Sequence, residues 1–458
     1  LLFTGMFTRV NFLFVLDMMI FVMMMFYCYR KLEERSLLFA FGVAFFVFLL
    51  GREFLQVFFR YKIERHYTLR TNNHTYLCIF LALSGVWMIY AYTEKKTCGR
   101  RLGKLNHYFD SIQDDVFNLY VKKLSKILFY GSMPFALGMR IVIAWFVRDA
   151  SYLEYYTDFV NILYSGNTLL YIVGRLENIM PVAFGIFLST LPSKREIKFP
   201  IIFYFIYLII SLGCGNRGTF VLGLLYIFVF VTYMQGKRPE EQWFKRKYML
   251  FFMLLIPVLA IAGSIYGTAR FGAGANIDSY FQEFINFFYD QGTSITLVKH
   301  AYELEERIPK QGPYLLEFLH SGILARLFGF KVYHGNTVEH ALYGGSFQHS
   351  IAYVVMGTSY LAGRGTGSSY LAELYYDLGY IGVFAGSALY GWIFCQIFKS
   401  KANNQFIRSF VWVLITQFLW SPRGPYTGFM SFFFAPTTIV SFIFIWVTAK
   451  LMTGRAGK

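Results

Sequence analysis

The chain has 458 residues, of which 56% are hydrophobic and only 15% are charged, and its mean hydropathy is +0.45. This composition excludes an ordinary soluble protein, because soluble domains do not carry hydrophobic runs of membrane-crossing length from one end to the other. The formal net charge of +17 fits Lys- and Arg-rich loops on the cytoplasmic side of a membrane and contacts with anionic membrane lipids, so no nucleic-acid partner is expected.

The hydrophobic runs predict an all-α integral membrane protein, a polytopic helical bundle of about 11 membrane-spanning helices within a range of 10–13. A span needs about 20 mostly apolar residues, because the hydrocarbon core is about 30 Å thick and a helix rises about 1.5 Å per residue. In chain order, the expected spans are 11–29, 37–59, 75–93, 126–147, 174–191, 199–214, 218–235, 247–266, 371–397, 405–421 and 430–450.

Lys and Arg residues are unevenly distributed among the connections, and their distribution predicts the orientation of the spans. The basic segments are 30–35, 95–126, 193–198, 236–247, 398–401 and 450–458. Alternating the expected spans across the membrane places all of them on one side, which is therefore expected to be cytoplasmic. The basic segment 52–70 is the exception, since the same alternation places it on the outer side.

A long stretch between the eighth and ninth expected spans, 267–370, contains Pro, Gly, His and charged residues and is not expected to cross the membrane. Loops of this length are usually functional or separately folded. We therefore expect one integrated membrane domain in three parts: an N-terminal bundle of about eight spans at 1–266, a large extracytoplasmic loop at 267–370, and a three-span segment at 371–458. Within the loop, 350–361 is apolar but short, which predicts a re-entrant or interfacial helix.

Arginines flanked by glycine form the first candidate site. They lie at or near the outer ends of expected spans, and they are Arg217, Arg270, Arg364 and Arg423. Glycine lets a backbone turn sharply and approach a ligand closely, and the planar guanidinium group donates paired hydrogen bonds to phosphate oxygens. Together at the membrane surface, these side chains would suit a lipid-linked pyrophosphate. The alternative is that they stabilise ordinary turns or contact the phosphates of membrane lipids.

A glycine- and serine-rich loop at 363–369 leads directly into the expected span at 371–397. In that helix Glu373 and Asp377 are four residues apart and therefore share one face. One carboxylate of such a pair could act as a general base, because its neighbour and its burial would raise its pKa. The alternative is structural: the carboxylates pair with the outer arginines and hold the loops together.

Tyrosine is abundant, with 35 residues, and aromatic residues make up 21% of the chain. Tyrosine favours membrane interfaces, and its ring and hydroxyl also suit cavities that bind sugars. Tyr376 and Tyr380 are four residues apart and share another face of the same expected helix, while Tyr370 precedes them at its start. These three tyrosines are candidates for sugar binding, and interfacial packing is the alternative.

Histidines in the long loop provide further candidates for acid–base chemistry. Their spacing matches no zinc signature, and they are His300, His320, His334, His340 and His349. His349 is the first candidate for a base or a substrate contact, because it lies just before the apolar segment 350–361, and His340 is the second. The alternative is that these side chains are simply solvated or packed.

Several common motifs are absent from the sequence. There is no Walker A loop, no Rossmann fingerprint and no DxD-type motif for a metal-bound nucleotide, and the five cysteines are scattered without a CxxC pair. We therefore expect no metal and no cofactor. Energy for bond formation would have to come from an activated substrate that is already in the membrane.

The segment 363–391, with the core Gly-Ser-Ser-Tyr-Leu-Ala-Glu-Leu-Tyr-Tyr-Asp-Leu-Gly-Tyr, resembles the late region of the Wzy-type O-antigen and capsule repeat-unit polymerases. The element Asn216-Arg217-Gly218 at the start of a span is similar to the Ser/Asn-Arg-Gly element of the same proteins. The many spans, the abundance of Phe and Tyr and the large late loop also fit this family. The resemblance covers nearly the whole chain in layout and two short segments in residues.

This resemblance implies a multi-pass glycosyltransferase of the bacterial inner (cytoplasmic) membrane with its active site on the extracytoplasmic face. Such an enzyme transfers a growing glycan from undecaprenyl pyrophosphate to an incoming lipid-linked repeat unit without a required metal, in a pathway with a flippase and a chain-length regulator. By position, the resemblance assigns Arg217 and Arg364 to the pyrophosphate and places Glu373 in the matching acidic segment. The roles of Arg423 and His349, and that of Arg270, rest on the chemistry of the residues alone.

In the expected mechanism the arginines neutralise the leaving pyrophosphate, and His349, Glu373 or Asp377 takes the proton from the acceptor hydroxyl. One alternative is an O-antigen ligase, which shares the donor and the outer arginines. A second is a transporter or flippase for the same lipid-linked oligosaccharide, which would need charged or broken spans along a path through the membrane. A non-catalytic membrane scaffold is a third alternative, but it would not explain the glycine-flanked arginines at the outer ends of the spans.

Overall fold

The computed structural model describes residues 10–62, 65–98, 116–149, 168–243, 280–399 and 405–456. These residues form helices and no strands. In the N-terminal part the elements are α2 (Phe12–Tyr29), α3 (Leu32–Phe45), the π-helical η1 (Phe46–Leu50), α4 (Gly51–Phe59), α5 (Leu69–Cys98), α7 (Val116–Asp149), α10 (Thr168–Leu176), α11 (Ile179–Ser189), α12 (Lys194–Gly213), α13 (Arg217–Lys237) and η3 (Pro239–Glu241). The C-terminal part contains α15 (Tyr280–Gln291), α16 (Thr293–Glu303), η4 (Glu305–Arg307), η5 (Tyr314–His320), α17 (Gly322–Leu327), α18 (Val338–Tyr343), α19 (Phe347–Met356), α20 (Thr358–Leu361), α21 (Tyr370–Lys399), α22 (Gln405–Trp420), η6 (Ser421–Arg423), α23 (Gly428–Phe433) and α24 (Pro436–Ala456).

Nine helical stretches within the described residues are long and apolar enough to cross a membrane, which confirms an all-α, multi-pass membrane protein. Each corresponds to a predicted span, and they are Phe12–Tyr29, Leu32–Phe59, Leu69–Lys96, Val116–Phe146, Ile172–Ser189, Lys194–Gly213, Arg217–Lys237, Tyr370–Ile397 and Pro436–Gly454. The predicted span 405–421 is α22, which has 16 residues. The predicted span 247–266 lies outside the described residues, so the total of 11 stays a prediction.

The helices α5 and α21 pack closely along the bundle because glycine replaces larger residues where they meet. A Cβ on Gly85 would lie 2.7 Å from the carbonyl oxygen of Phe384, and a Cβ on Gly391 would overlap the carbonyl oxygen of Val86. Glycine thus lets the two backbones touch. This contact fixes the second half of α21 against α5.

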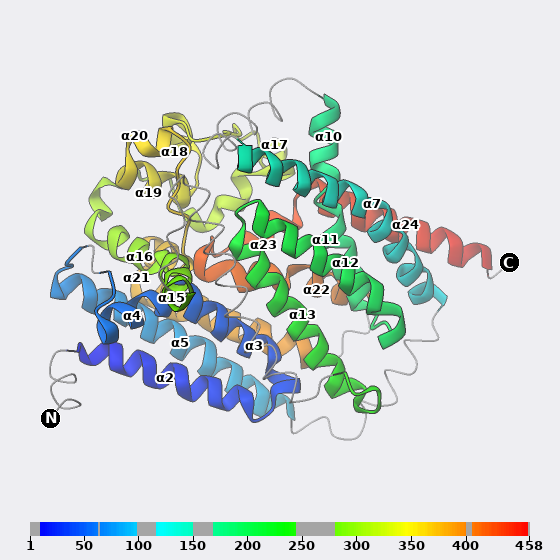
Figure 1. The fold of residues 1–458 in the computed structure, drawn as a ribbon, viewed down its shortest axis with the longest axis horizontal. Helices are drawn as coiled ribbons and strands as arrows, with labels where there is room; N and C mark the ends of the chain where they lie inside the picture. The colour runs from blue at the N-terminus through cyan, green and yellow to red at the C-terminus, as the bar shows by residue number, and fades with distance from the viewer. Residues whose placement is uncertain are drawn as a thin grey trace.

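The short helices between residues 280 and 369 lie toward one end of the bundle: Figure 1 shows α17–α20 at the top, and α15 and α16 below them on the left. The predicted short helix at 350–361 corresponds to α19 and α20, which are separated by Gly357 with a φ of 53° and a ψ of −116°. Within the described part of this loop, no helix is long enough to cross a membrane. The described part of the loop, 280–370, therefore forms a cap of short helices on one end of the bundle.

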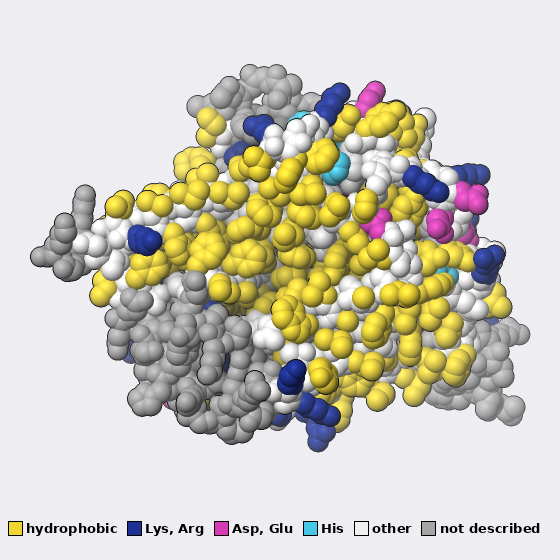
Figure 2. All heavy atoms as spheres, turned by 180° about the vertical axis from the view of Figure 1, so that it is seen from behind, with side chains coloured by type: hydrophobic (Ala, Val, Ile, Leu, Met, Phe, Trp, Pro, Cys, Tyr) yellow, Lys and Arg dark blue, Asp and Glu magenta, His cyan; other side chains and the backbone are white. Residues whose placement is uncertain are grey.

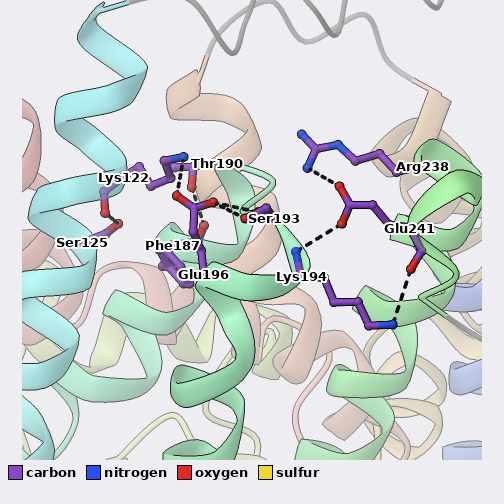
Figure 3. Close-up of polar contacts among 9 residues, drawn as sticks. All are labelled: Lys122, Ser125, Phe187, Thr190, Ser193, Lys194, Glu196, Arg238 and Glu241. Atoms are coloured by element: carbon purple, nitrogen blue, oxygen red, sulfur yellow. Dashed lines mark hydrogen bonds and ion pairs between the residues drawn. The ribbon is translucent and has the colours of Figure 1, made fainter.

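The opposite end of the bundle carries basic connections that are joined by ion pairs. Lys122 at the start of α7 pairs with Glu196 at the start of α12 at 2.9 Å, and the backbone N–H of Lys194 donates to Glu241 at 3.2 Å (Figure 3). Arg35 at the start of α3 pairs at 2.7 Å with a glutamate near the end of α5. Segments predicted to share one side of the membrane thus lie at the same end of the molecule.

Between the two ends, the surface of the bundle is apolar. Figure 2 shows mostly hydrophobic side chains across the middle of one face, while acidic and basic side chains gather at its rims. Exposed apolar residues such as Phe26 and Ile381 belong to the membrane-crossing helices. A broad apolar belt of this kind is the surface that lipid tails would cover.

Candidate active site

Trp420, the last residue of α22, determines how two of the candidate arginines are placed. Its indole fills the space beside two glycines: a Cβ on Gly218 would lie 2.6 Å from Cζ3, and a Cβ on Gly424 would overlap the indole ring. Gly218 follows Arg217 at the start of α13, and Gly424 follows Arg423 at the end of η6. The glycines of the two motifs thus allow one indole to pack against both arginine-bearing segments.

Arg217 and Arg423 meet at the turn between α15 and α16. The Nη1 group of Arg423 donates to the carbonyl oxygen of Gln291 at 2.8 Å, and Nη1 of Arg217 lies 3.5 Å from Oδ2 of Asp290. Gly292 is the N-cap of α16, and no side chain caps this helix start. Amide groups at a helix start favour anions. The turn therefore combines two guanidinium groups with the positive end of a helix dipole.

A third arginine, Arg52 of α4, packs against the same turn. A Cβ on Gly292 would lie 2.5 Å from the Cβ of Arg52. The Nη2 group of Arg52 donates to the hydroxyl of Tyr289 at 2.9 Å, and its guanidinium lies 4.0 Å from the centre of that ring. Arg52 is not among the arginines predicted from the sequence, although Gly51-Arg52 repeats the glycine–arginine pattern near the end of an expected span.

The basic segment 52–70 is the one that alternation of the spans places on the outer side. Its described residues contact α15 and α16. Arg65 pairs with Glu303 at 2.8 Å, and Lys62 donates to the side chain of Asn286 at 2.7 Å. Groups of the long loop thus contact Lys62 and Arg65, and Glu303 compensates the charge of Arg65. This compensation gives a physical reason for positive charge at this end of the bundle.

Arg364 lies in an exposed loop beside the loop that carries Arg423. Its backbone carbonyl accepts a hydrogen bond from Asn336 at 2.8 Å, but its guanidinium forms no hydrogen bond or ion pair with the described residues. Three residues later, a Cβ on Gly367 would lie 3.7 Å from the carbonyl oxygen of Arg423. The two loops are therefore neighbours. The remaining candidate arginine, Arg270, lies outside the described residues.

Glu373 is fully buried in the first turn of α21 and joins the two loops that carry arginines. Its Oε1 accepts from the hydroxyl of Ser368 at 2.5 Å, and its Oε2 accepts from the backbone N–H of Tyr426 at 2.7 Å. Ser368 belongs to the loop of Arg364, and Tyr426 belongs to the loop of Arg423. Because both oxygens are engaged and none is exposed, the arrangement suits a residue that positions the loops.

A second buried carboxyl, that of Glu317 in η5, lies within electrostatic range of Glu373. Its Oε1 accepts from the hydroxyl of Ser346 at 2.9 Å, and its Oε2 is buried without a hydrogen-bond partner among the described residues. Burial raises the pKa of Glu317 to about 7. Glu317 is not among the residues predicted from the sequence, because a single acidic residue in a long loop gives no spacing signal.

Asp377 is half-buried and lines an open pocket together with Tyr376. Its Oδ2 accepts from the backbone N–H of Leu315 at 2.8 Å. The carbonyl of Leu315 in turn accepts from the hydroxyl of Thr427 at 3.0 Å. Thr427 is four residues after Arg423, so Asp377 lies near the loop that carries this arginine.

The candidate tyrosines have different surroundings because α21 breaks at Gly379, whose φ of 64° and ψ of −159° are not helical. Tyr376 precedes the break and donates to a backbone carbonyl after η4 at 3.1 Å, whereas the hydroxyl of Tyr380 lies 2.9 Å from Nδ1 of His74 in α5. The four-residue spacing therefore does not place Tyr376 and Tyr380 on one helical face. Tyr370 is fully buried among other aromatic rings.

His349 and His340 form a stacked pair in the cap of short helices. Their ring centres are 3.6 Å apart, and Nδ1 of His349 lies 2.8 Å from the hydroxyl of Tyr360. Burial, together with the neighbouring His340, lowers the pKa of His349 to about 3, so the ring is neutral near pH 7. Among the described residues, no hydrogen bond connects this pair to the arginines or to Glu373.

Comparison with known protein families gives a decisive match. The family model described as O-antigen polysaccharide polymerase Wzy matches residues 1–456, which is essentially the whole chain. The chain belongs to the Wzy family of O-antigen polysaccharide polymerases. No curated protein and no solved structure matches it.

Wzy membership confirms the resemblance carried by the segment 363–391 and the element Asn216-Arg217-Gly218. It assigns the chain to the membrane polymerases, similar to glycosyltransferases, that act on lipid-linked oligosaccharide repeat units. The apolar helices agree with a multi-pass membrane protein. Among the described residues, no group of three or more His, Cys, Asp or Glu side chains is arranged to hold a metal ion.

Proposed function

We propose that this Wzy-family chain joins O-antigen repeat units that are carried on undecaprenyl pyrophosphate, at the extracytoplasmic face of the bacterial inner membrane. The observation that supports the proposal is the meeting of Arg52, Arg217 and Arg423 at the α15–α16 turn. Guanidinium groups around a helix start offer the donors that a diphosphate requires. In this proposal, residues 267–370 are the extracytoplasmic loop.

The proposed reaction is a single glycosyl transfer. The bond between C1 of the first donor sugar and the pyrophosphate oxygen breaks, and C1 forms a new bond to a hydroxyl oxygen of the acceptor repeat unit. The proton of that hydroxyl passes to a base, and undecaprenyl pyrophosphate leaves with its negative charge. Arg217 and Arg423 stabilise this charge as it develops, with Arg364 and Arg270 at the edge of the site. The activated donor supplies the energy, so the reaction as proposed uses no metal and no cofactor.

The pyrophosphate is proposed to replace Asp290 as the partner of Arg217. The present ion pair is long, at 3.5 Å, and the side chain of Asp290 is 52% exposed. The side chain of Arg217 is 14% exposed. A long ion pair with one solvent-exposed partner contributes roughly 0–1 kcal/mol. A doubly charged diphosphate can therefore displace the carboxylate at little cost.

Three carboxyl or imidazole groups are candidates for the general base, and we favour Asp377. It is half-buried, lines a pocket and lies near the loop of Arg423. Glu373 is fully buried and is better suited to positioning the two loops. His349 is neutral near pH 7, as a base must be, but its hydrogen bonds lie within the cap of short helices.

The proposal is tested by chain growth with purified protein in lipid nanodiscs and lipid-linked repeat units from the host. Arg217→Ala and Arg423→Ala should each lower the rate about 100-fold or more, because each removes a donor to the leaving group. Arg423→Lys should retain part of the rate, since lysine keeps the charge but loses the paired donors. Arg238→Ala, at the opposite end of the bundle, serves as the matched control and should behave as the wild type.

Two results would contradict the proposal. The first is the absence of chain growth by folded wild-type protein with intact lipid-linked repeat units. The second is wild-type polymer length and rate in both Arg217→Ala and Arg423→Ala. The polymer ladder on gels also separates polymerase from ligase activity, since a ligase would transfer single units to a lipid core without extending them.

A further inference from the structure

An open pocket of about 600 Å³ borders the outer part of α21. Its walls come from α21 at Tyr376–Leu378, from η4, from the start of η5 and from the chain between η4 and η5. The polar groups that face it are Glu305, Glu306, Lys310 and Asp377. Neither the family match nor the proposed binding of the pyrophosphate by the arginines assigns a role to this pocket.

Hydrogen bonds to the backbone hold two side chains of the pocket in place. The hydroxyl of Tyr376 donates to the carbonyl oxygen of Ile308 at 3.1 Å, which fixes the orientation of the ring. The backbone N–H of Leu315 donates to Asp377 at 2.8 Å. The pocket is therefore preformed around one aromatic ring and one carboxylate, which lowers the cost of ordering a ligand.

The charges of the pocket select the class of ligand. Three carboxylates face it, from Glu305, Glu306 and Asp377, against the single ammonium group of Lys310. This excess of negative charge repels a phosphate. Carboxylates accept hydrogen bonds from sugar hydroxyls, and an aromatic ring packs against the apolar face of a sugar. The pocket thus suits a neutral ligand rich in hydroxyl groups.

An aromatic surface continues beyond the pocket. Glu305 lies within electrostatic range of both Tyr375 and Tyr376. The rings of Tyr375 and Tyr380 are 5.0 Å apart, and the ring of Tyr302 lies 6.2 Å from that of Tyr375. These rings pack around His74 of α5 and form an aromatic cluster beside Tyr376, which lines the pocket.

The pocket also lies close to the loop that carries Arg423. Leu315, which lines the pocket, accepts a hydrogen bond at its carbonyl from the hydroxyl of Thr427 at 3.0 Å. Thr427 is the fourth residue after Arg423, and a chain of that length spans at most about 14 Å. A bound oligosaccharide of a few sugars can bridge this distance.

We propose that this pocket, lined by Glu305, Glu306, Lys310, Tyr376 and Asp377, binds sugars of the acceptor repeat unit and directs its hydroxyl toward the donor. The inference rests on the proposed function, because it assigns the second substrate of that reaction to its own site. The negatively charged pocket would then receive the neutral sugars, while the arginines receive the diphosphate. Separate sites of opposite charge would keep the two substrates in the correct order.

The test measures the binding of two probes to the full chain in nanodiscs. One probe is the phosphate-free oligosaccharide released by mild acid from the host's own lipid-linked repeat units, and the other is undecaprenyl pyrophosphate. The double variant Glu305→Gln/Glu306→Gln should bind the oligosaccharide at least 10-fold more weakly and undecaprenyl pyrophosphate unchanged. Both side chains are exposed, so the variant should fold normally. Glu240→Gln, exposed at the other end of the bundle, is the matched control.

A second variant, Tyr376→Leu, removes the ring and should weaken binding of the oligosaccharide by a similar factor. Wild-type affinity for the oligosaccharide in both pocket variants would overturn the inference, as would the absence of oligosaccharide binding by the wild type. Failure of the proposed function has a different signature, which is unchanged affinity for undecaprenyl pyrophosphate in Arg423→Ala. The binding measurements therefore distinguish a failure of the pocket inference from a failure of the proposed function.

Discussion

At the scale of single residues, the candidate site depends on glycine as much as on arginine. The indole of Trp420 packs beside Gly218 and Gly424 and meets the ring of Phe48 edge-on at 5.6 Å. The guanidinium of Arg423 lies 5.9 Å from the centre of the same Phe48 ring. A compact aromatic core thus lies beneath the charged groups, and the absence of a side chain at the two glycines permits it.

Gly218→Ala should therefore impair polymerisation without removing any charge. The new Cβ would lie 2.6 Å from Cζ3 of Trp420, so the indole or the start of α13 must move. Overpacking of this kind costs about 1–3 kcal/mol and displaces neighbouring groups. We expect at least a 10-fold lower rate of chain growth in the nanodisc assay and a lower unfolding midpoint in detergent.

The matched control is Gly131→Ala in α7, where a Cβ would meet no atom within 4 Å. Alanine is the better helix former, so this variant should keep wild-type activity and be as stable as the wild type or more so. If Gly218→Ala also behaved as the wild type, the packing of Trp420 would have no role in placing Arg217.

Single residues were predictable where their chemistry is local, and unpredictable where it depends on distant contacts. Arg217 and Arg423 were recognised because glycine and arginine stand next to each other in the sequence. Arg52 has the same local pattern, but its role follows from Tyr289, which is 237 residues away in the chain. Glu317 gave no signal at all, since its burial depends on packing between η5 and α21.

At the scale of elements, a buried ion pair fixes α16 against the second membrane-spanning helix. The Nζ of Lys299 lies 2.7 Å from Oε2 of Glu53, and both side chains are at most 5% exposed. The hydroxyl of Tyr76 in α5 also donates to Glu53 at 2.5 Å. Since Glu53 follows Arg52, this contact sets the position of the α15–α16 turn relative to Arg52.

Lys299→Met should destabilise the protein by about 3–5 kcal/mol, because it leaves a buried carboxylate without its cation. Glu53→Gln should also destabilise it, although glutamine retains an acceptor for the hydroxyl of Tyr76. The double variant should be more stable than the sum of the single effects implies, by about 1–3 kcal/mol. The free energy of unfolding of the wild type, the two single variants and the double variant is measured by titration with SDS in dodecylmaltoside micelles. Additive effects would show that the two charges do not interact in the folded state.

The membrane-crossing helices were predictable from the length of the apolar runs, but the interruptions within these helices were not. The runs specify membrane-crossing helices because lipid requires every backbone group to be paired within the helix. The break at Gly379 gave no such signal, since a single glycine is tolerated inside many helices. Its φ of 64° separates the surroundings of Tyr376 and Tyr380, which the spacing had placed on one face.

At the scale of the whole molecule, charge and chemistry separate to the two ends of an apolar bundle. The arginines, the buried carboxyls and the pocket lie beside the α15–α16 turn, η5 and the start of α21. These elements belong to the end of the bundle that carries the short helices (Figure 1). The ion pair of Lys122 with Glu196 and the hydrogen bond from the backbone N–H of Lys194 to Glu241 lie at the other end (Figure 3). The distribution of Lys and Arg among the connections predicted this division, because successive spans alternate in direction. Which end faces the cytoplasm follows from the positive-inside rule and not from the fold.

Accessibility of single cysteines to a membrane-impermeant maleimide tests this orientation. Glu306→Cys lies beside the pocket and Glu240→Cys lies at the other end, and both positions are exposed. In a Cys98→Ser background, the native cysteines Cys28, Cys78, Cys214 and Cys395 are buried and should react little. In intact spheroplasts Glu306→Cys should be labelled within minutes, and Glu240→Cys only after permeabilisation. The reverse pattern would place the arginines on the cytoplasmic side, where a polymerase of lipid-linked units exported by a flippase would not meet its substrate.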